Sequence, residues 1–369
     1  MIAVYILFGL YAAFITVLIY GWMRLPVPCR SDVDKSDDPF ISVIVPIRNE
    51  TSNIIGLLQD LEKQDCPREK FEVLLINDHS EDDTCQVVRA YGKNTNLNIR
   101  LIDLVEVTGK KQGITAGVKQ AKGGVILQTD GDCRVGNQWV LTYMRAFSQS
   151  EKKMFFGPVC IQQSSFWAEL QSIEFASLVG TGAATSFFRR ITMLNGANMA
   201  FTKEVFNEVN GFEGNLEVPS GDDEFLAGKI NALYPGSIQF LKRREVVVET
   251  KPVHSVGKWI MQRKRWAGKW NKGGNKVFAF SLFLFYMTVL LMVLAGAYGW
   301  LPVGLLFVLW AIKGVVDSLF IAVVMRFMKQ RVNIFYLVLL DILYPFYSII
   351  IGILSNFGKY SWKGREYDI

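Results

Sequence analysis

The sequence of 369 residues lacks the features of several common protein classes. No G-x-G-x-x-G follows an expected strand and no G-x-x-x-x-G-K-[ST] occurs, so dinucleotide-binding and P-loop chemistry are not indicated. No two cysteines are spaced as Cys-x-x-Cys, which predicts reduced thiols rather than a disulfide framework or a zinc site. The five cysteines are Cys29, Cys66, Cys85, Cys133 and Cys160.

The sequence also contains few histidines and only a small excess of positive charge. With 40 Lys and Arg against 34 Asp and Glu, the formal net charge is +6. This balance suits contact with an anionic membrane surface better than binding of nucleic acid, for which no module is present. The two histidines, His79 and His254, have no metal-ligand spacing. We therefore expect neither a nucleic-acid partner nor a histidine-bound metal.

Long hydrophobic runs, by contrast, lie at both ends of the chain. Hydrophobic residues make up 50% of the sequence, and the mean hydropathy is +0.22. Residues 1–22 carry no charge and can cross about 30 Å of hydrocarbon. They lack a basic n-region and a small-residue cleavage site. Residues 1–24 are therefore predicted to be a retained transmembrane helix.

Residues 277–355 are predicted to form about three further spans, at Val277–Tyr298, Leu301–Met325 and Asn333–Ser355. By the positive-inside rule, the cations that flank these spans place the intervening domain on the cytosolic side of a multi-pass protein of the cell membrane. These cations are Arg24, Lys35, Lys272, Lys276, Arg326, Lys329 and Arg331. Lys359, Lys363 and Arg365 then fall on the far side, so a last segment that re-enters is the alternative.

Between the hydrophobic ends, residues 38–254 have the composition of a globular domain, and residues 255–272 that of an interfacial amphipathic helix. Within the domain, apolar strands alternate with segments of helical periodicity, which predicts an α/β fold with a mostly parallel sheet covered on both faces. The expected strands are 40–46, 71–76, 99–105 and 124–129, and the expected helices are 53–64, 84–91 and 113–121.

Polar residues follow three of these strands directly. Pro46 to Glu50 end the first strand, Asp78 follows the second, and Asp130 and Asp132 follow the fourth. Ligands of parallel sheets bind beyond the carboxyl ends of the strands, so these groups are expected to form one site.

Asp130 and Asp132 bracket a glycine, so both carboxylates can turn toward one point. Mg²⁺, or Mn²⁺ with a similar preference for oxygen, binds through one or two carboxylates and substrate phosphates. A metal site is the functional interpretation, and an ordinary Asp-Gly turn is the alternative.

A second acidic run, Asp222-Asp223-Glu224, precedes an apolar helix-like stretch. Crowded carboxylates raise one another's pKa, and one of them can take a proton from an attacking hydroxyl. Asp223 is our first candidate for this base and Asp222 the second. The alternative is a helix N-terminus that gains from negative charge.

Two basic segments complete the set of candidates. Gln262-x-x-Arg265-Trp266 lies in the predicted amphipathic helix. Arg265 could stabilise a leaving diphosphate, and Trp266 could stack on an acceptor. The alternative is that this helix serves only as a membrane anchor. Lys110 follows a glycine and can reach a phosphate, or it is a solvated lysine. Three charged residues, Lys313, Asp317 and Asp341, lie inside the predicted spans. Charged residues within a membrane span often belong to a functional site, and helix–helix packing is the alternative interpretation.

These segments, in this order, resemble the motifs of the family 2 inverting glycosyltransferases. The resemblance is to the membrane-bound branch that contains cellulose, chitin and hyaluronan synthases and ceramide glucosyltransferase, and it covers about residues 40–270. The matching segments are Val45-Pro-Ile-Arg-Asn-Glu50, Ile76-Asn-Asp78-His-Ser80, Gly109-Lys110, Asp130-Gly-Asp132, Asn195-Gly-Ala-Asn-Met199 with Gly211-Phe212, Gly221-Asp-Asp223 and Gln262-Arg-Lys-Arg265-Trp266.

The resemblance implies a GT-A fold, a UDP- or GDP-sugar donor, and Mg²⁺ or Mn²⁺ on its diphosphate. It implies that Asp78 and Asp130 hold the nucleoside, Asp132 the metal and Arg265 the leaving diphosphate, and that Asp223 accepts the acceptor proton. Pro46, Glu50 and Lys110 are further donor-binding candidates, and Gln262 and Trp266 further acceptor-side candidates. Asn77 stands where the family has Asp, His79 where it has Gly, and Asp222 where it has Glu.

The expected function is transfer of one sugar from a nucleotide donor to a lipid-embedded hydroxyl, because the membrane part is small for a polymer channel. A processive polysaccharide synthase, with a glycan acceptor, is the first alternative. An inactive membrane-anchored sugar-binding scaffold is the second.

Overall fold

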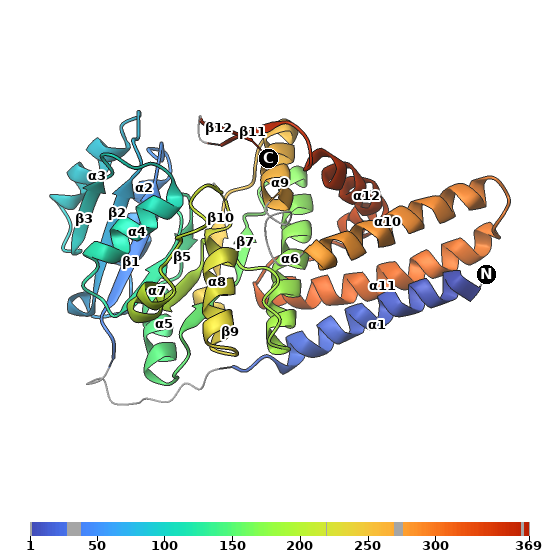
Figure 1. Cartoon of the computed structure of the whole chain (residues 1–369), viewed down its shortest axis with the longest axis horizontal. Coiled ribbons are helices and arrows are strands. Elements are labelled where there is room, and N and C mark those ends of the chain that lie inside the picture. Colours follow the sequence, from blue (N-terminus) through green and yellow to red (C-terminus); the bar gives the residue numbers. More distant parts are fainter. Residues whose placement is uncertain (1, 28–37, 219, 269–275, 363–364, 369) are drawn as a thin grey trace. The chain divides into compact units, whose positions relative to one another are not determined.

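The chain forms two compact units. A computed structural model describes residues 2–27, 38–218, 220–268, 276–362 and 365–368 (Figure 1). We call Leu25–Cys160 with Ser186–Lys251 the sheet unit, and Met1–Arg24 with Ile161–Thr185 and Pro252–Ile369 the helical unit. The sequence did not predict that Ile161–Thr185 would group with the apolar ends of the chain. The domain limits 38–254 stay a prediction.

A seven-stranded sheet with the order β3-β2-β1-β4-β8-β6-β9 forms the core of the sheet unit. Strands β3, β2, β1 and β4 are parallel neighbours, β8 is antiparallel to β4 and β6, and β9 is parallel to β6. The strands are β1 Ile41–Ile47, β2 Phe71–Asn77, β3 Ile99–Asp103, β4 Val125–Gln128, β6 Met154–Phe156, β8 Met199–Thr202 and β9 Ile238–Phe240. The predicted mostly parallel α/β fold is confirmed.

Strands β1, β2 and β4 are buried on both faces of the sheet. Successive side chains of a strand point to opposite faces, and almost every residue of these three strands is buried. The helices that follow the strands provide part of this cover; on α4, Gly113 lies against Ile76 and Gly117 against Ile44. The helices are α2 Ile54–Glu62, α3 Thr84–Gly92, α4 Lys110–Gln120, α5 Trp139–Ser148, α7 Lys203–Glu208 and α8 Asp222–Leu233.

A second, small sheet has the order β5-β10-β7. Its strands are β5 Arg134–Val135, β7 Val159–Ile161 and β10 Val248–Thr250, and two short 3-10 helices lie at Arg68–Lys70 and Arg244–Val246. The four cysteines that the structure describes are free thiols, as predicted, and Cys29 lies outside the described residues. Burial raises the pKa of Cys66 and of Cys160 to about 12, so both stay protonated thiols at neutral pH.

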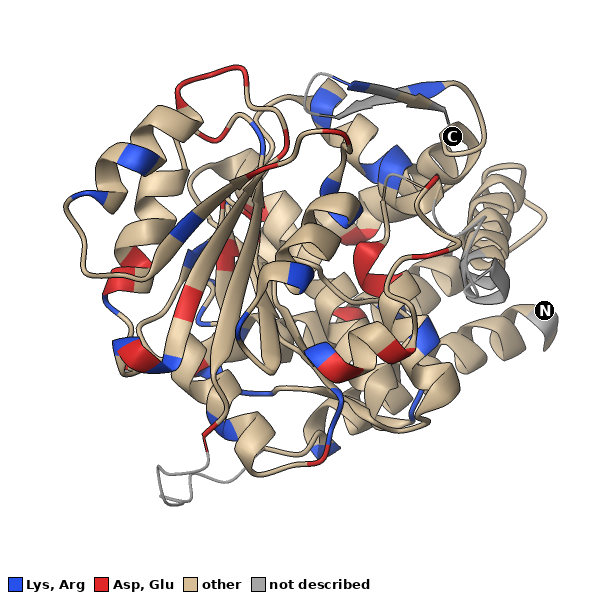
Figure 2. Cartoon of the chain, turned by 60° about the vertical axis from the view of Figure 1, so that its left-hand side comes forward, with Lys and Arg blue, Asp and Glu red and all other residues tan. Residues whose placement is uncertain are grey.

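Long helices make up most of the helical unit. They are α1 Ile2–Arg24, α6 Phe166–Phe187, α9 Val256–Gly268, α10 Lys276–Ala297, α11 Val303–Phe327 and α12 Ile334–Leu354, followed by a hairpin of β11 Lys359–Trp362 and β12 Arg365–Asp368. Residues 269–272, the end of the predicted amphipathic helix, lie outside the described residues. Charge is common in the sheet unit, whereas α1 carries only Arg24 (Figure 2).

Three described helices are long and apolar enough to cross a membrane, at Val4–Arg24, Val303–Phe327 and Ile334–Leu354. They correspond to the first, third and fourth predicted spans. The second predicted span forms α10, and its described apolar part is Phe283–Ala297. Side chains of all four helices share one buried cluster, which includes Phe8, Tyr286, Leu309 and Ile349.

The predicted intramembrane charges pair with one another. Lys313 is 1% exposed, and its Nζ lies 2.8 Å from Asp317 Oδ2 and 2.5 Å from Asp341 Oδ1. Tyr11 of α1 donates its hydroxyl to Asp317, and Trp310 donates its indole N–H to Asp341. These contacts join α1, α11 and α12, which favours the packing interpretation of these charges.

Candidate active site

The carboxyl ends of β1 and β2 lie side by side in register. Pro46 pairs with Ile76, Ile47 pairs with Asn77, and the Asp78 amide donates to the Ile47 carbonyl at 2.9 Å. Residues that follow either strand therefore meet at one edge of the sheet, as the sequence predicted.

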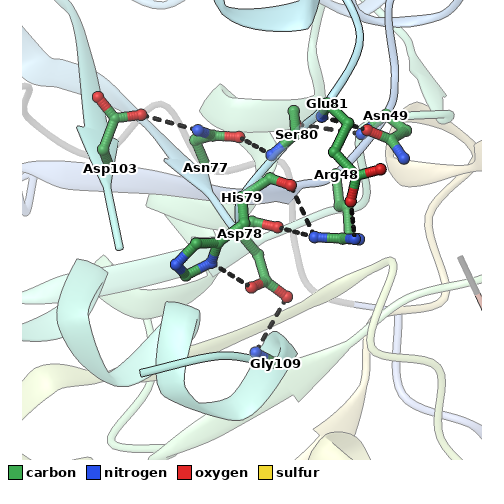
Figure 3. Close-up of polar contacts among 9 residues, drawn as sticks. All are labelled: Arg48, Asn49, Asn77, Asp78, His79, Ser80, Glu81, Asp103 and Gly109. Atoms are coloured by element: carbon green, nitrogen blue, oxygen red, sulfur yellow. Dashed lines mark hydrogen bonds and ion pairs between the residues drawn. The ribbon is translucent and has the colours of Figure 1, made fainter. Parts of the chain in front are cut away.

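Asp78 is the centre of a polar network at this edge (Figure 3). Its Oδ1 lies 3.2 Å from His79 Nδ1, and its Oδ2 accepts a hydrogen bond from the Gly109 amide at 2.9 Å. Arg48 donates to the backbone carbonyls of Asp78 and His79 at 2.8 and 2.7 Å. The strand end is therefore held from both sides, by the turn after β1 and by the residue before α4.

His79 occupies a backbone conformation that favours glycine. Its φ is 56°, in the left-handed region, and this is the position where the resembled family has Gly. The strained backbone brings the imidazole beside the Asp78 carboxylate (Figure 3). The sequence showed the substitution but not that the ring would contact Asp78.

Lys110, the first residue of α4, bridges two candidate carboxylates. Its Nζ lies 2.8 Å from Asp130 Oδ1 and 3.2 Å from Asp222 Oδ2. Burial alone lowers the pKa of Lys110, but the two carboxylates outweigh it and raise this pKa above its ordinary value. Lys110 is therefore a charged group of the site rather than a solvated lysine.

Asp222 and Asp223 begin α8, and both are buried, at 8% and 7% exposure. Asp222 Oδ2 accepts a hydrogen bond from Gln128 Nε2 at 2.9 Å in addition to the Lys110 contact. Asp223 Oδ2 accepts one from the Gly196 amide at 3.1 Å. The two neighbouring carboxylates thus have different partners.

Gly196 allows this close approach because it has no side chain. A Cβ at this position would lie 2.6 Å from Asp222 Oδ2 and 3.1 Å from Lys110 Nζ. The glycine belongs to the loop Asn195–Met199, which leads into β8. The antiparallel strand, which the sequence did not predict, therefore brings this loop to the carboxylates.

Glu50, Asp132 and Pro46 complete the sheet-unit candidates. Glu50 is 3% exposed and accepts a hydrogen bond from Asn53 Nδ2 at 2.7 Å, while Pro46 lies within β1. Asp132 Oδ1 lies 3.7 Å from Cys133 Sγ. Burial, and then the charges of Asp132 and Asp130, raise the pKa of the Cys133 thiol, so this cysteine stays protonated.

Asp130 and Asp132 are the candidate ligands of a divalent cation. In the described part of the chain, no three His, Cys, Asp or Glu side chains gather as a complete protein-only metal site. Mg²⁺ is usually bound by one or two carboxylates together with substrate phosphates. The two carboxylates at this strand end fit that type of site and do not form a preformed cage.

Gln262, Arg265 and Trp266 lie on α9 in the helical unit, whereas the other candidates belong to the sheet unit. The one buried residue of α9 is Arg263, at 2% exposure. Its guanidinium donates to both oxygens of Glu174 on α6, and the Tyr347 hydroxyl of α12 donates to the same carboxylate.

Arg263 also contacts two of the α9 candidates. Its Nη1 donates to Gln262 Oε1 at 2.5 Å, and its Cζ lies 4.3 Å from the ring centroid of Trp266. Burial alone lowers the pKa of Arg263, but the Glu174 charge outweighs burial and raises it. Arg263 therefore orients Gln262 and Trp266 within the helical unit.

Sequence reasoning missed Gln128 and Arg263 as residues of these clusters. Gln128 is the only polar residue of β4, and that polarity in an apolar strand was the available signal. Arg263 lies inside the Gln262–Trp266 segment, but nothing in the sequence distinguished the buried arginine from the partly exposed Arg265.

Residues 42–209 match the family model for glycosyl transferase family 2. Glycosyltransferase AglE of Haloferax volcanii is 35% identical over 103 residues, which are 28% of this chain and 33% of AglE. Poly-beta-1,6-N-acetyl-D-glucosamine synthase of Staphylococcus epidermidis is 24% identical over 240 residues, which are 64% of this chain and 55% of the synthase. The chain thus spans a third to about half the length of these relatives.

Among solved structures, the mannosyltransferase PcManGT from Pyrobaculum calidifontis, in complex with GDP-Man and Mn²⁺, superimposes with a TM-score of 0.55. The match covers 96% of each chain at 18% identity. It confirms the expected GT-A fold. The candidate membrane helices toward both ends of this chain, Val4–Arg24, Val303–Phe327 and Ile334–Leu354, agree with the expected apolar ends.

Proposed function

We propose that this chain, whose residues 42–209 match the family model for glycosyl transferase family 2, is a membrane-bound, metal-dependent, inverting glycosyltransferase of that family. It transfers a sugar from a nucleotide-sugar donor to the hydroxyl of a lipid-embedded acceptor. The three candidate membrane helices support a membrane location, and the positive-inside pattern supports a cytosolic active site. The GDP-Man and Mn²⁺ bound to PcManGT support the donor class and the metal.

One observation carries the proposal: Lys110, Asp130, Asp222 and Asp223 converge, through Gln128 and Gly196, at the carboxyl edge of one sheet. A lysine held beside these carboxylates at the edge of the sheet provides a fixed positive charge, which suits the transfer of a group from an anionic leaving group.

In the proposed reaction, the acceptor oxygen attacks the anomeric carbon on the face opposite the diphosphate. The bond from this carbon to the diphosphate oxygen breaks, the oxygen keeps the electron pair, and the configuration inverts. Asp223 takes the hydroxyl proton. Asp222, bound to Lys110 and Gln128, positions Lys110 beside the diphosphate.

In this proposal, several cations stabilise the negative charge of the leaving diphosphate. A divalent ion held by Asp132 and Asp130 would neutralise its charge when bound. Lys110 stabilises it in the sheet unit, and Arg265 is the proposed diphosphate group of α9. Pro46, Glu50 and Asp78 are the proposed donor-binding residues, and Gln262 and Trp266 the proposed acceptor-side residues.

Turnover of purified protein with labelled donor tests the proposal. Asp223→Asn should retain donor binding and lose turnover by about two to four powers of ten, as expected for a positioned base. Asp132→Ala should lose metal-dependent binding instead. Near-normal turnover of Asp223→Asn would transfer the base role to Asp222, and wild-type protein that neither binds nor consumes a nucleotide-sugar would refute the proposal.

A processive polysaccharide synthase is the second candidate, because the similarity to the Staphylococcus epidermidis synthase extends over 64% of this chain. Extraction of the labelled product separates the two candidates. Label in the chloroform phase supports the lipid acceptor, and label retained as high-molecular-weight polymer supports the synthase.

A further inference from the structure

Lys111, the residue after Lys110, is a buried lysine in the first turn of α4, at 4% exposure. Its Nζ donates hydrogen bonds to the backbone carbonyls of Asn215 and Val218, at 2.7 Å each. A lysine ammonium has three donor hydrogens and no acceptor, and burial of its charge is costly unless polar groups compensate for the lost water. The two carbonyls provide part of this compensation, and the contact joins their loop to the start of α4.

The loop that Lys111 binds, residues 209–218, follows α7 and precedes α8. A second lysine, Lys229 of α8, binds the first half of the same loop. Its Nζ donates to the carbonyls of Gly211 and Glu213, at 2.9 and 2.6 Å. The first half of the loop is therefore held by α8 itself, whereas the second half, which leads into α8, is held by α4.

Lys111 also contacts the first turn of α8. Its Nζ lies 4.5 Å from the ring centroid of Phe225, a distance at which an ammonium group is attracted to the face of an aromatic ring. In the sequence, Val218 precedes Asp222 and Asp223, and Phe225 follows them. One ammonium group therefore attaches the chain to α4 on both sides of the two carboxylates.

The two neighbouring lysines of α4 have different partners. Consecutive side chains of an α-helix point about 100° apart, so they reach different surroundings. Lys110 reaches the carboxylates of Asp130 and Asp222, where the diphosphate is proposed to lie. Lys111 reaches the loop and the ring that flank Asp223. The start of α4 thus carries one contact to the proposed donor side and one to the segment that bears the proposed base.

We propose that Lys111 is a positioning residue for sugar transfer. It fixes residues 209–218 and the first turn of α8 to α4, and thereby sets the place of the Asp223 carboxylate relative to Lys110. Lys111 itself contacts neither substrate and takes no proton. A displaced base slows the reaction without weakening nucleotide binding. This inference rests on the proposed function, because it concerns the base of that reaction.

Replacement of Lys111 by Met in the full chain in detergent tests the inference. Release of UDP or GDP from their sugars, with membrane lipids of the expressing cells as acceptor, measures turnover. Calorimetric titration with UDP or GDP and Mn²⁺ gives the Kd and counts the binding sites. The Kd should stay within about threefold of wild type, while kcat per binding site should fall at least about tenfold. A purely structural role would lower the number of binding sites and leave kcat per site unchanged.

Two lysines of the same helix provide the matched controls. Lys110→Met removes the proposed diphosphate contact and should raise the Kd at least about tenfold, since a hydrogen bond to a charged group is lost. Lys119→Met, at an exposed cation in the last turn of α4, should change neither the Kd nor kcat. Hydrogen exchange gives a reading that needs no substrate: the amides of residues 209–218 should exchange faster in Lys111→Met and at the wild-type rate in Lys119→Met.

If Lys111→Met does not fold, Lys111→Gln, whose amide still donates to one carbonyl, should lose at least about threefold in kcat per site. Wild-type kcat per site in the folded variant, or a Kd that rises in parallel with the loss of kcat, would overturn the positioning role while leaving the glycosyltransferase proposal intact. Unchanged exchange of residues 209–218 would show that Lys111 does not fix the loop, whatever the reaction. Wild-type protein that neither binds nor consumes these nucleotide-sugars would instead refute the proposed function.

Discussion

Arg263 and Glu174 form an ion pair in which both side chains are almost completely buried, at 2% and 3% exposure. The pair joins α9 to α6, and Tyr347 extends it to α12. The helix proposed to contact the acceptor is thus fixed to α6 by a charged contact, and the Tyr347 hydroxyl links the same carboxylate to α12, a candidate membrane helix.

Replacement of Arg263 by Met should strongly destabilise the protein. It leaves the Glu174 charge buried without its partner, a change that costs about 3–5 kcal/mol. Thermal unfolding in detergent should show a clearly lower Tm, and the double variant Arg263→Met with Glu174→Met should recover much of it. Lys258→Met, at an exposed cation on the same helix, is the control. An unchanged Tm in Arg263→Met would show that the pair contributes nothing to stability.

Gly196→Ala should impair catalysis more than folding. The added Cβ would lie 2.6 Å from Asp222 Oδ2, so the carboxylate or the loop must move, and Lys110 with it. We expect turnover to fall at least about tenfold, in line with the sensitivity of catalysis to a misplaced group.

The matched control is Gly228→Ala, within α8 and with open space at the Cβ position. It should retain activity and gain up to about 1 kcal/mol of stability from helix propensity. Equal activity losses in the two variants would contradict the role assigned to Gly196.

Lys110 should contribute to stability equally at neutral and mildly alkaline pH. Its folded pKa is raised above the ordinary 10.5 by Asp130 and Asp222, against the opposing effect of burial. When folding raises the pKa of a lysine, the resulting stabilisation of the folded state is complete at pH values below the pKa in the unfolded chain. It is lost as the pH rises through the pKa in the folded protein. The Tm difference between wild type and Lys110→Met should therefore be the same at pH 7.5 and pH 9.5. A difference that shrinks by pH 9.5 would show that Lys110 loses its proton in the folded state.

Lys313→Met should lower the yield of folded protein from membranes. It removes the cation that lies between Asp317 and Asp341, and unpaired carboxylates are costly within a span. The triple variant Lys313→Met, Asp317→Asn, Asp341→Asn should recover yield and Tm, because no charge remains. A normal yield and Tm of Lys313→Met would show that the cluster does not serve helix packing.

Much of the fold followed from hydrophobic periodicity. The parallel strands 41–47 and 71–77 and helix 84–92 lie within one or two residues of their predicted limits. Helix α4 begins three residues earlier than predicted, at Lys110, because Gly109 adopts a φ of 100° that turns the chain into it. The antiparallel strand β8 and helix α6 were missed, since α6 alternates small and apolar residues without a clear polar face.

The sequence by itself determined which polar residues stand at the ends of strands, because an apolar run that stops at a charged residue marks its own boundary. It also determined the apolar spans, through length and composition. Only the tertiary structure decided which groups meet: Gln128 and Asp222 are 94 positions apart. Such contacts depend on how β4, α4 and α8 pack against one another, and a local sequence pattern carries no information about which residues far apart in the sequence come into contact.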